Sequence, residues 1–185
     1  MSRTQRLLLC VTALAGAALA GSALYAAEEA GSAKLPDAVA RAFKAEFPKG
    51  EIVNAVAEKK EGVDVYDIEF KEGGLERETD IAADGTILTA AALVDAKQVP
   101  DAAMKAIQAA AEGGKIRQIA KIEIRCECKD GKVTKLAKAK VNFEADLTKS
   151  DKAAKIVVDD KGNVVEAPKW AAPKEETPAP KAEKK

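Results

Sequence analysis

The stretch VPDAAMKAIQ (Val99–Gln108) repeats, with small changes, the stretch LPDAVARAFK (Leu35–Lys44). The two stretches align at an offset of 64 residues, with a proline, an aspartate and an alanine in the same places. A later pair of turn sequences, DGTI from Asp84 and KGNV from Lys161, aligns at an offset of 77 residues. A unit that occurs twice in this way indicates one duplicated module, with about 13 extra residues inside its second copy.

Each of the two stretches predicts a helix that begins at its proline. A proline is tolerated in the first turn because its missing N–H has no helical partner there. Asp37 and Asp101 follow the prolines, and a carboxylate is favourable at a helix N-terminus. Apolar residues recur at helical spacing in both stretches, and the sequence predicts helix ends at Pro48 and Gly113.

Residues 115–149 alternate apolar and charged side chains, which predicts two long antiparallel strands. The tetrapeptide KDGK (Lys129–Lys132) between them is typical of a two-residue hairpin turn. That turn places the first and last lysines of the tetrapeptide opposite each other. Continued outward, the same register places Glu123 opposite Lys138 on a charged face, with the other face apolar.

The expected fold class is therefore α+β, in two tandem modules. Each module is expected to be a helix packed on a roughly four-stranded antiparallel sheet, whose other face is polar. The first module is expected to span residues 34–97, and the second to span residues 98–167.

The two ends of the chain have the composition of segments outside the fold. Residues 1–26 have the pattern of a signal peptide, with two arginines, an apolar run and small residues at its end. An uncleaved N-terminal membrane anchor is the alternative, since residues 7–27 are uncharged. The signal peptide predicts a periplasmic or secreted protein without stable membrane insertion after cleavage. Residues 168–185 are rich in Pro, Lys and Glu and predict a disordered tail. Trp170 in this tail either docks back on the domain or lies exposed.

The composition argues against several classes of function. The 30 basic and 30 acidic residues give a formal net charge of zero, which does not suggest a nucleic-acid-binding protein. The chain has no histidine, which removes the commonest general base and every Ser-His or Cys-His nucleophile pair. We therefore expect no enzyme activity, no catalytic residues and no cofactor.

Cys126 and Cys128 are two residues apart on a predicted strand, so both thiols point to one face. They are interpreted as small apolar residues that end a buried stripe. The alternative is a metal-binding or redox pair of an envelope protein that handles metals or small ligands. The acidic turns DIAADG (80–85) and VVDDKGN (157–163) lack the spaced oxygen ligands of a calcium loop, and their residues are those that tight turns require.

Charge is divided unevenly between the two expected modules. Residues 34–97 contain 9 basic and 14 acidic residues, whereas residues 98–167 contain 14 basic and 11 acidic residues. The exposed sheet face can therefore form a bipolar surface that attracts a charged protein partner. The alternative is a set of solvated strand faces. The candidate partner-binding residues are Arg117, Lys121, Arg125, Lys138 and Lys140 on the basic side, and Asp67, Glu69, Glu76 and Glu78 on the acidic side.

The segments LPDAVARAFKAEFPKGEIVNA, VYDIEFKEGG and IAADGTIL together resemble the PepSY-like domain, a secreted bacterial module related to the beta-lactamase-inhibitor protein. The resemblance covers residues 34–88, and more loosely residues 98–167, where the Phe-Pro turn after the helix is missing. It implies a tandem helix-and-sheet fold, export, and binding or inhibition of another protein, often a peptidase. It transfers no catalytic residue.

Overall fold

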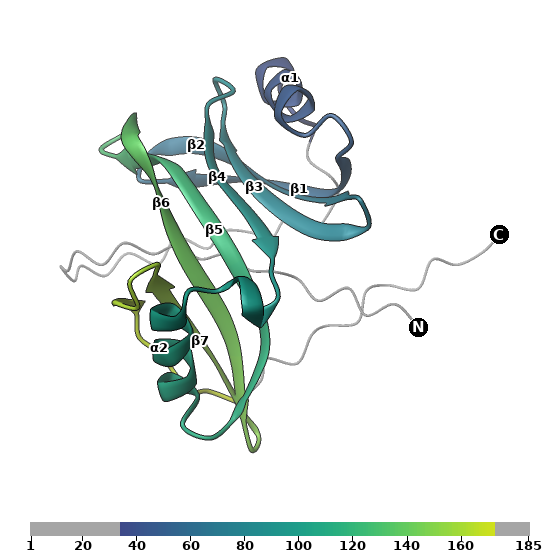
Figure 1. Ribbon diagram of the computed structural model, residues 1–185. Coiled ribbons are helices and arrows are strands. Elements are labelled where there is room, and N and C mark those ends of the chain that lie inside the picture. The colour runs from purple at the N-terminus through teal and green to yellow at the C-terminus, as the bar shows by residue number, and fades with distance from the viewer. Residues whose placement is uncertain (1–33, 173–185) are drawn as a thin grey trace.

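A computed structural model describes residues 34–172 of the chain. These residues form two α-helices, a short 3₁₀ turn and eight strands, and Figure 1 shows the helices at opposite ends of the sheet. The helices are α1 (Asp37–Glu46) and α2 (Asp101–Ala111). The strands are β1 (Glu51–Lys60), β2 (Val63–Glu72), β3 (Leu75–Ala82), β4 (Ile87–Leu93), β5 (Lys115–Lys129), β6 (Lys132–Lys149), β7 (Lys152–Asp159) and β8 (Val164–Glu166).

The eight strands form one antiparallel sheet in sequence order, from β1 to β8. The expected fold class, two tandem modules with a sheet each, is therefore wrong. The two halves are joined where β4 pairs with β5, from Thr89 opposite Ile124 to Leu93 opposite Ala120. In two separate sheets, β4 and β5 would have exposed edges with unpaired N–H and C=O groups, and pairing them satisfies those groups.

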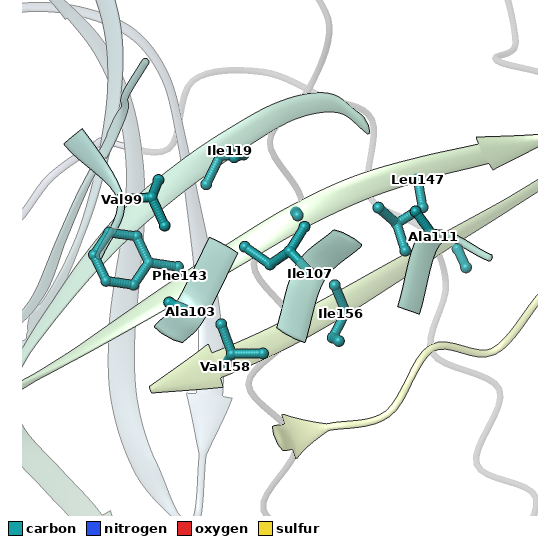
Figure 2. Close-up of a cluster of buried hydrophobic side chains, with 11 residues drawn as sticks. Val99, Ala103, Ile107, Ala111, Ile119, Phe143, Leu147, Ile156 and Val158 are labelled. Carbon is teal, nitrogen blue, oxygen red and sulfur yellow. The ribbon is translucent and has the colours of Figure 1, made fainter. Parts of the chain in front are cut away.

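Both helices begin directly after the prolines that the sequence indicates, Pro36 and Pro100. In α2 the residues facing the sheet are buried, and Figure 2 shows Ile107 of α2 among Phe143 and Leu147 of β6 and Ile156 of β7. Aliphatic side chains dominate this cluster, in keeping with the low aromatic content of the chain. Burial of these side chains supplies the free energy that holds α2 on the sheet.

The core under α1 is aromatic instead. Phe70 of β2 lies edge-on to Phe43, with 5.0 Å between ring centroids, and 4.5 Å from the ring of Phe47. The guanidinium of Arg77 lies over the Phe47 ring at 5.1 Å from its centroid, a cation–π contact that covers the edge of this core. Three of the four phenylalanines of the chain therefore hold α1 in place.

A glycine turn lies against the first turn of each helix. A Cβ added to Gly85 would lie 2.9 Å from the carbonyl oxygen of Ala38, and one added to Gly162 would lie 2.5 Å from that of Ala102. Both glycines have a positive φ, +91° and +83°. The alanines are 64 residues apart and the glycines 77, which are the two offsets of the sequence repeat. The duplication itself stays a prediction from the sequence.

The β5–β6 hairpin follows the predicted register only near its turn. Lys129 lies opposite Lys132, as predicted, but the register shifts beyond Cys126. Glu123 then lies opposite Val141, so the predicted pairing of Glu123 with Lys138 is wrong. The physical reason is a β-bulge between Ile124 and Cys126, which bends the tip of the hairpin out of line with the rest of β5 and β6. Figure 1 shows this end of the hairpin beside the β1–β2 end of the sheet.

Parts of the predictions for the chain ends lie outside the described residues, including the whole signal peptide, residues 1–26. Within residues 34–172, no helix combines the length and apolar composition needed to cross a membrane. Trp170 packs against the α2 cluster, and Ala171 forms a bridge with Ala153 of β7. Of the two alternatives for Trp170, docking on the domain is therefore confirmed.

Candidate functional site

Both helices pack on the same face of the sheet. Ala90 of β4 belongs to the core under α1 and lies opposite Glu123 of β5. Lys121 is two residues from Glu123 on β5, so it is on the same face. It lies opposite Phe143, which belongs to the core under α2. Directly opposite residues of an antiparallel pair point to the same face, so one face carries both helices. We call the other face the open face, because neither described helix covers it.

The open face carries a row of carboxylates that crosses neighbouring strands. Asp67 of β2 lies opposite Asp80 of β3, and Glu69 lies opposite Glu78. Like charges directly opposite each other on adjacent strands are destabilising, and here two such pairs occur side by side. We call the following set the acidic face: Glu58, Asp67, Glu69, Glu76, Glu78, Asp80, Glu144 and Asp146.

Asp80 is the best satisfied member of the acidic face. Its Oδ1 accepts a hydrogen bond of 2.7 Å from Lys60 Nζ, and its Oδ2 accepts one of 2.7 Å from the hydroxyl of Thr89. Lys60 Nζ also lies 2.9 Å from Glu58 Oε1. Burial lowers the pKa of Lys60, but the two carboxylates outweigh burial, and its pKa is raised above the ordinary value. Lys60 is therefore a fixed positive charge within the acidic face.

Within residues 34–172, Glu78 and Asp67 each have a buried oxygen without a hydrogen-bond partner. Glu78 is only 2 % exposed, and its Oε2 has no hydrogen-bond partner among the described residues. Asp67 Oδ1 is likewise buried without a partner. Burial, followed by the charges of neighbouring carboxylates, raises the pKa of Glu78 to about 10 and that of Asp67 to about 7. The centre of the acidic face therefore holds protons at neutral pH.

At the β6–β7 end of the acidic face, a second lysine is paired with two carboxylates. Lys155 Nζ lies 2.6 Å from Glu144 Oε1 and 3.8 Å from Asp146 Oδ1. Gln118 donates a hydrogen bond of 2.8 Å to the other oxygen of Asp146. This end of the acidic face is thus partly neutralised, whereas the buried carboxyl oxygens without a hydrogen-bond partner among the described residues belong to Glu78 and Asp67.

The tip of the β5–β6 hairpin closes one end of the open face. Beyond the bulge, Cys126 packs with Val65, Ala82 and Leu88 in a small separate core. The amide of Gly131 at the tip donates a hydrogen bond of 2.7 Å to Glu61 O in the β1–β2 turn. The register prediction missed this bulge. Because of the bulge, the hairpin tip packs against the β1–β2 turn.

The predicted acidic residues lie together, whereas the predicted basic residues do not. Asp67, Glu69, Glu76 and Glu78 are all on the open face, on β2 and β3. Lys121 lies on the face that carries the helices, and Arg125 reaches α1 on that face.

Arg125 forms an ion pair with the end of α1. Its Nη1 lies 2.7 Å from Oε1 of Glu46, at the end of α1, and its Nε donates to Glu123. Arg125 therefore helps to hold α1 on the sheet.

The other predicted basic residues are also dispersed. Lys140 lies on the open face opposite Ile124, and its Nζ is 2.5 Å from Glu127 Oε1. Arg117 and Lys138 fall in the two register shifts of the β5–β6 hairpin. Because an odd shift moves alternate side chains to the other face, the expected basic half does not form one patch beside the acidic face.

The cysteine pair lies at the edge of the small core under the hairpin tip. Cys126 is 6 % exposed, its thiol points to Ile87 O at 3.6 Å, and Cys128 packs beside it. Both thiols are free, and burial raises the pKa of each. The positions fit the interpretation of small apolar residues that end a buried stripe.

Thiol labelling tests this interpretation. In a chain with Cys10→Ser and Cys128→Ser, we expect a thiol reagent at pH 8 to modify Cys126 at least about a hundredfold more slowly than after denaturation, since a buried thiol reacts only when the fold opens locally. Labelling at equal rates in the folded and denatured chain would contradict the buried position.

One group of described carboxylates has the spacing of a metal site. Ligand oxygens of Glu58, Asp67 and Asp80 lie within 4.8 Å of one another. The ammonium of Lys60 is already hydrogen-bonded to Asp80 and lies beside Glu58. A divalent ion would have to displace this lysine, so these residues are better suited to their internal ion pair than to a metal.

The comparisons with known proteins concern the fold. No protein-family model and no curated protein sequence matches the chain. The chain shares its fold with a BLIP-like protein. That protein, from Bacteroides fragilis, superposes with a TM-score of 0.53 at 15% identity, over 80% of this chain and 94% of its own.

Two further solved structures from Bacteroides have the same fold. One, from Bacteroides eggerthii, is a protein inferred to be periplasmic; its TM-score is 0.54 at 15% identity, covering 75% of this chain and 89% of that chain. The other is a DUF2874 family protein from Bacteroides uniformis. Its TM-score is 0.52 at 14% identity, and the match covers 75% of this chain and 90% of that chain. The BLIP-like part of the resemblance is thus supported at the level of fold, and the PepSY-like assignment and the duplication stay predictions.

Sequence reasoning missed four members of the acidic face, namely Glu58, Asp80, Glu144 and Asp146. A signal for Asp80 was present, because it follows Glu76 and Glu78 at the two-residue spacing of one strand face. Glu144 and Asp146 carry the same spacing on β6, but only the pairing of β4 with β5 brings them to the face of Glu78.

Proposed function

We propose that this protein is an exported, non-enzymatic binding protein whose acidic face receives basic side chains of a protein partner in the cell envelope. The observation that carries the proposal is Glu78, a residue 2 % exposed whose Oε2 lacks a hydrogen-bond partner among the described residues. In the isolated protein this buried carboxyl group stays protonated, because ionising it without a partner is unfavourable. A lysine or arginine side chain from a partner would offset that cost.

The arrangement of charge supports a cationic ligand over a neutral one. Glu69 and the exposed Glu76 lie around Glu78 and Asp67 on the same face and add negative potential, part of which Lys71, opposite Glu76, offsets. Clustered charge of one sign attracts partners of the opposite sign and selects against others. The partner is therefore a protein with a basic surface, and an envelope enzyme such as a peptidase is one candidate that the resemblance implies.

The cellular location is part of the proposal. The signal-peptide pattern of residues 1–26 supports export, and the fold is shared with a protein from Bacteroides eggerthii that is inferred to be periplasmic. Inhibition of the partner is the function that the resemblance to the PepSY-like domain, and through it to the beta-lactamase-inhibitor protein, suggests. The use of Cys126 and Cys128 as a metal-binding pair is less favoured, because both thiols pack in the core under the hairpin tip.

Site-specific photocrosslinking in cells tests the proposal. A photoreactive amino acid at Glu76, exposed on the acidic face, is expected to crosslink a discrete envelope protein. The same amino acid at Lys105, exposed on α2, serves as the control and is expected to give no such product. Reversal of charge by Glu69→Lys is expected to reduce the Glu76 crosslink at least about tenfold, since a like charge then opposes the partner.

The matched control for charge reversal is Lys121→Glu, which changes a charge on the face that carries the helices. It is expected to leave the crosslink unchanged. Equal loss with Lys121→Glu and Glu69→Lys, or a crosslink from Lys105 alone, would show that the partner does not bind at the acidic face.

A further inference from the structure

The large apolar side chains that remain exposed are concentrated at the edges of the sheet. The described residues include six of them: Ile52, Val53, Val56, Leu75, Val164 and Val165. Three lie on β1 and two on β8, which are the two edge strands. Apolar side chains gathered at a strand edge indicate an interaction surface.

The two edges differ in length. β8 has 3 residues, and a short edge strand offers little backbone for pairing. β1 has 10 residues without a proline and, among the described strands, pairs only with β2. Alternate N–H and C=O groups along its outer side are therefore available to another strand. Val56, near the middle of this strand, is 49 % exposed.

The sequence of β1 is complementary to itself in one antiparallel register. With Val56 opposite Val56 of a second copy, Asn54 lies opposite Glu58, and an amide donates well to a carboxylate. Val53 is the extra residue of a β-bulge, so Glu51 is on the same face as Val56 and comes opposite Lys60. No pair of like charges meets in this register.

We propose that β1 pairs with β1 of a second copy of this chain across a two-fold axis at Val56, which joins two eight-stranded sheets into one. The interface is isologous, so each favourable pair off the axis occurs twice. Pairing satisfies the outer backbone groups of β1 and buries the valines that water now contacts. The open face of each copy stays on the same side of the joined sheet, because directly opposite residues share a face.

Sedimentation of the full chain as a function of concentration tests the dimer. We expect wild type to pass from monomer to dimer, and Val56→Lys to weaken dimerisation at least about tenfold, since two ammonium groups meet at the axis and the contact between the two valines is lost. The matched control is Val165→Lys on β8, also more than half exposed at 58 %, which is expected to dimerise as wild type does.

Disulfide trapping gives an independent measurement. Val56→Cys places two thiols opposite each other at the axis and is expected to form a covalent dimer on mild oxidation. Val53 is 50 % exposed, nearly as Val56 is, but lies off the axis, so Val53→Cys is expected to remain reduced. A wild type that is monomeric at all concentrations would overturn the proposal. So would dimerisation that is lost with Val165→Lys, or a peptide strand that binds β1 while the chain stays monomeric.

Discussion

Gly162→Ala is expected to lower the free energy of unfolding by about 3 kcal/mol or more. Gly162 has φ +83°, a conformation that costs about 1–2 kcal/mol for a residue with a side chain. The added Cβ would also lie 2.5 Å from Ala102 O and 2.8 Å from Ala102 C, so α2 or the turn must move. Both atoms belong to the backbone of the first turn of α2, which cannot rotate away as a flexible side chain would. Urea denaturation followed by circular dichroism measures the loss.

Gly131→Ala is the matched control for the contact with α2. Gly131 also has a positive φ, +74°, but an added Cβ would find no atom within 4 Å. Its expected loss is only the conformational cost, about 1–2 kcal/mol. The difference between the two variants therefore measures the close approach of the β7–β8 turn to α2. Equal losses would show that the turn and the helix are not held as close as the structure has them.

Glu78→Gln is expected to raise the free energy of unfolding at pH 7.5 by about 3–4 kcal/mol. The pKa of Glu78 is about 10 in the folded protein, against an ordinary value of 4.5. Above pH 4.5 the folded protein therefore binds a proton that the unfolded chain releases. Stability falls by about 1.4 kcal/mol per pH unit from pH 4.5 up to pH 10. Glutamine has the shape of a protonated glutamate and does not ionise in the unfolded chain, so it removes this fall.

The pH dependence separates this effect from simple repacking. At pH 4.5 Glu78 is protonated in the folded protein and half protonated in the unfolded chain, so Glu78→Gln is expected to change stability by less than about 0.5 kcal/mol there. The control is Glu76→Gln, an exposed member of the acidic face, which is expected to change stability by less than about 0.5 kcal/mol at both pH values. A gain for Glu78→Gln that is the same at pH 4.5 and pH 7.5 would refute the linkage to protonation.

Asp67 is expected to add to the fall of stability with rising pH, but over a narrower pH range than Glu78. Its pKa is raised from 3.8 to about 7, so its contribution to stability is lost as pH rises through this interval and is constant above it. If a basic side chain binds between Asp67 and Glu78, both carboxyl groups ionise, and binding releases protons. The proposed function and the stability profile therefore rest on the same two buried carboxyl groups.

Several elements of the fold could be predicted because their signals are local. Pro36 and Pro100 mark the starts of α1 and α2, and the spacing of apolar residues after them identifies the buried stripes. The turn at Asp130 and Gly131, where both residues have positive φ, fixes the register of the residues nearest to it. The spacing of Glu76 and Glu78 places both on one face of β3, whatever lies beside that strand.

The sequence alone determined, then, where the helices begin, where the β5–β6 hairpin turns, and that β2 and β3 present acidic residues on one side. Tertiary structure decided that β4 pairs with β5 in one continuous sheet, that the β5–β6 register shifts beyond Cys126, and that Glu78 is buried without a partner. The reason is the range of the interactions. Caps, turns and alternation act between residues a few positions apart, whereas the choice of strand partner and the burial of a carboxyl group depend on segments that are distant in the chain.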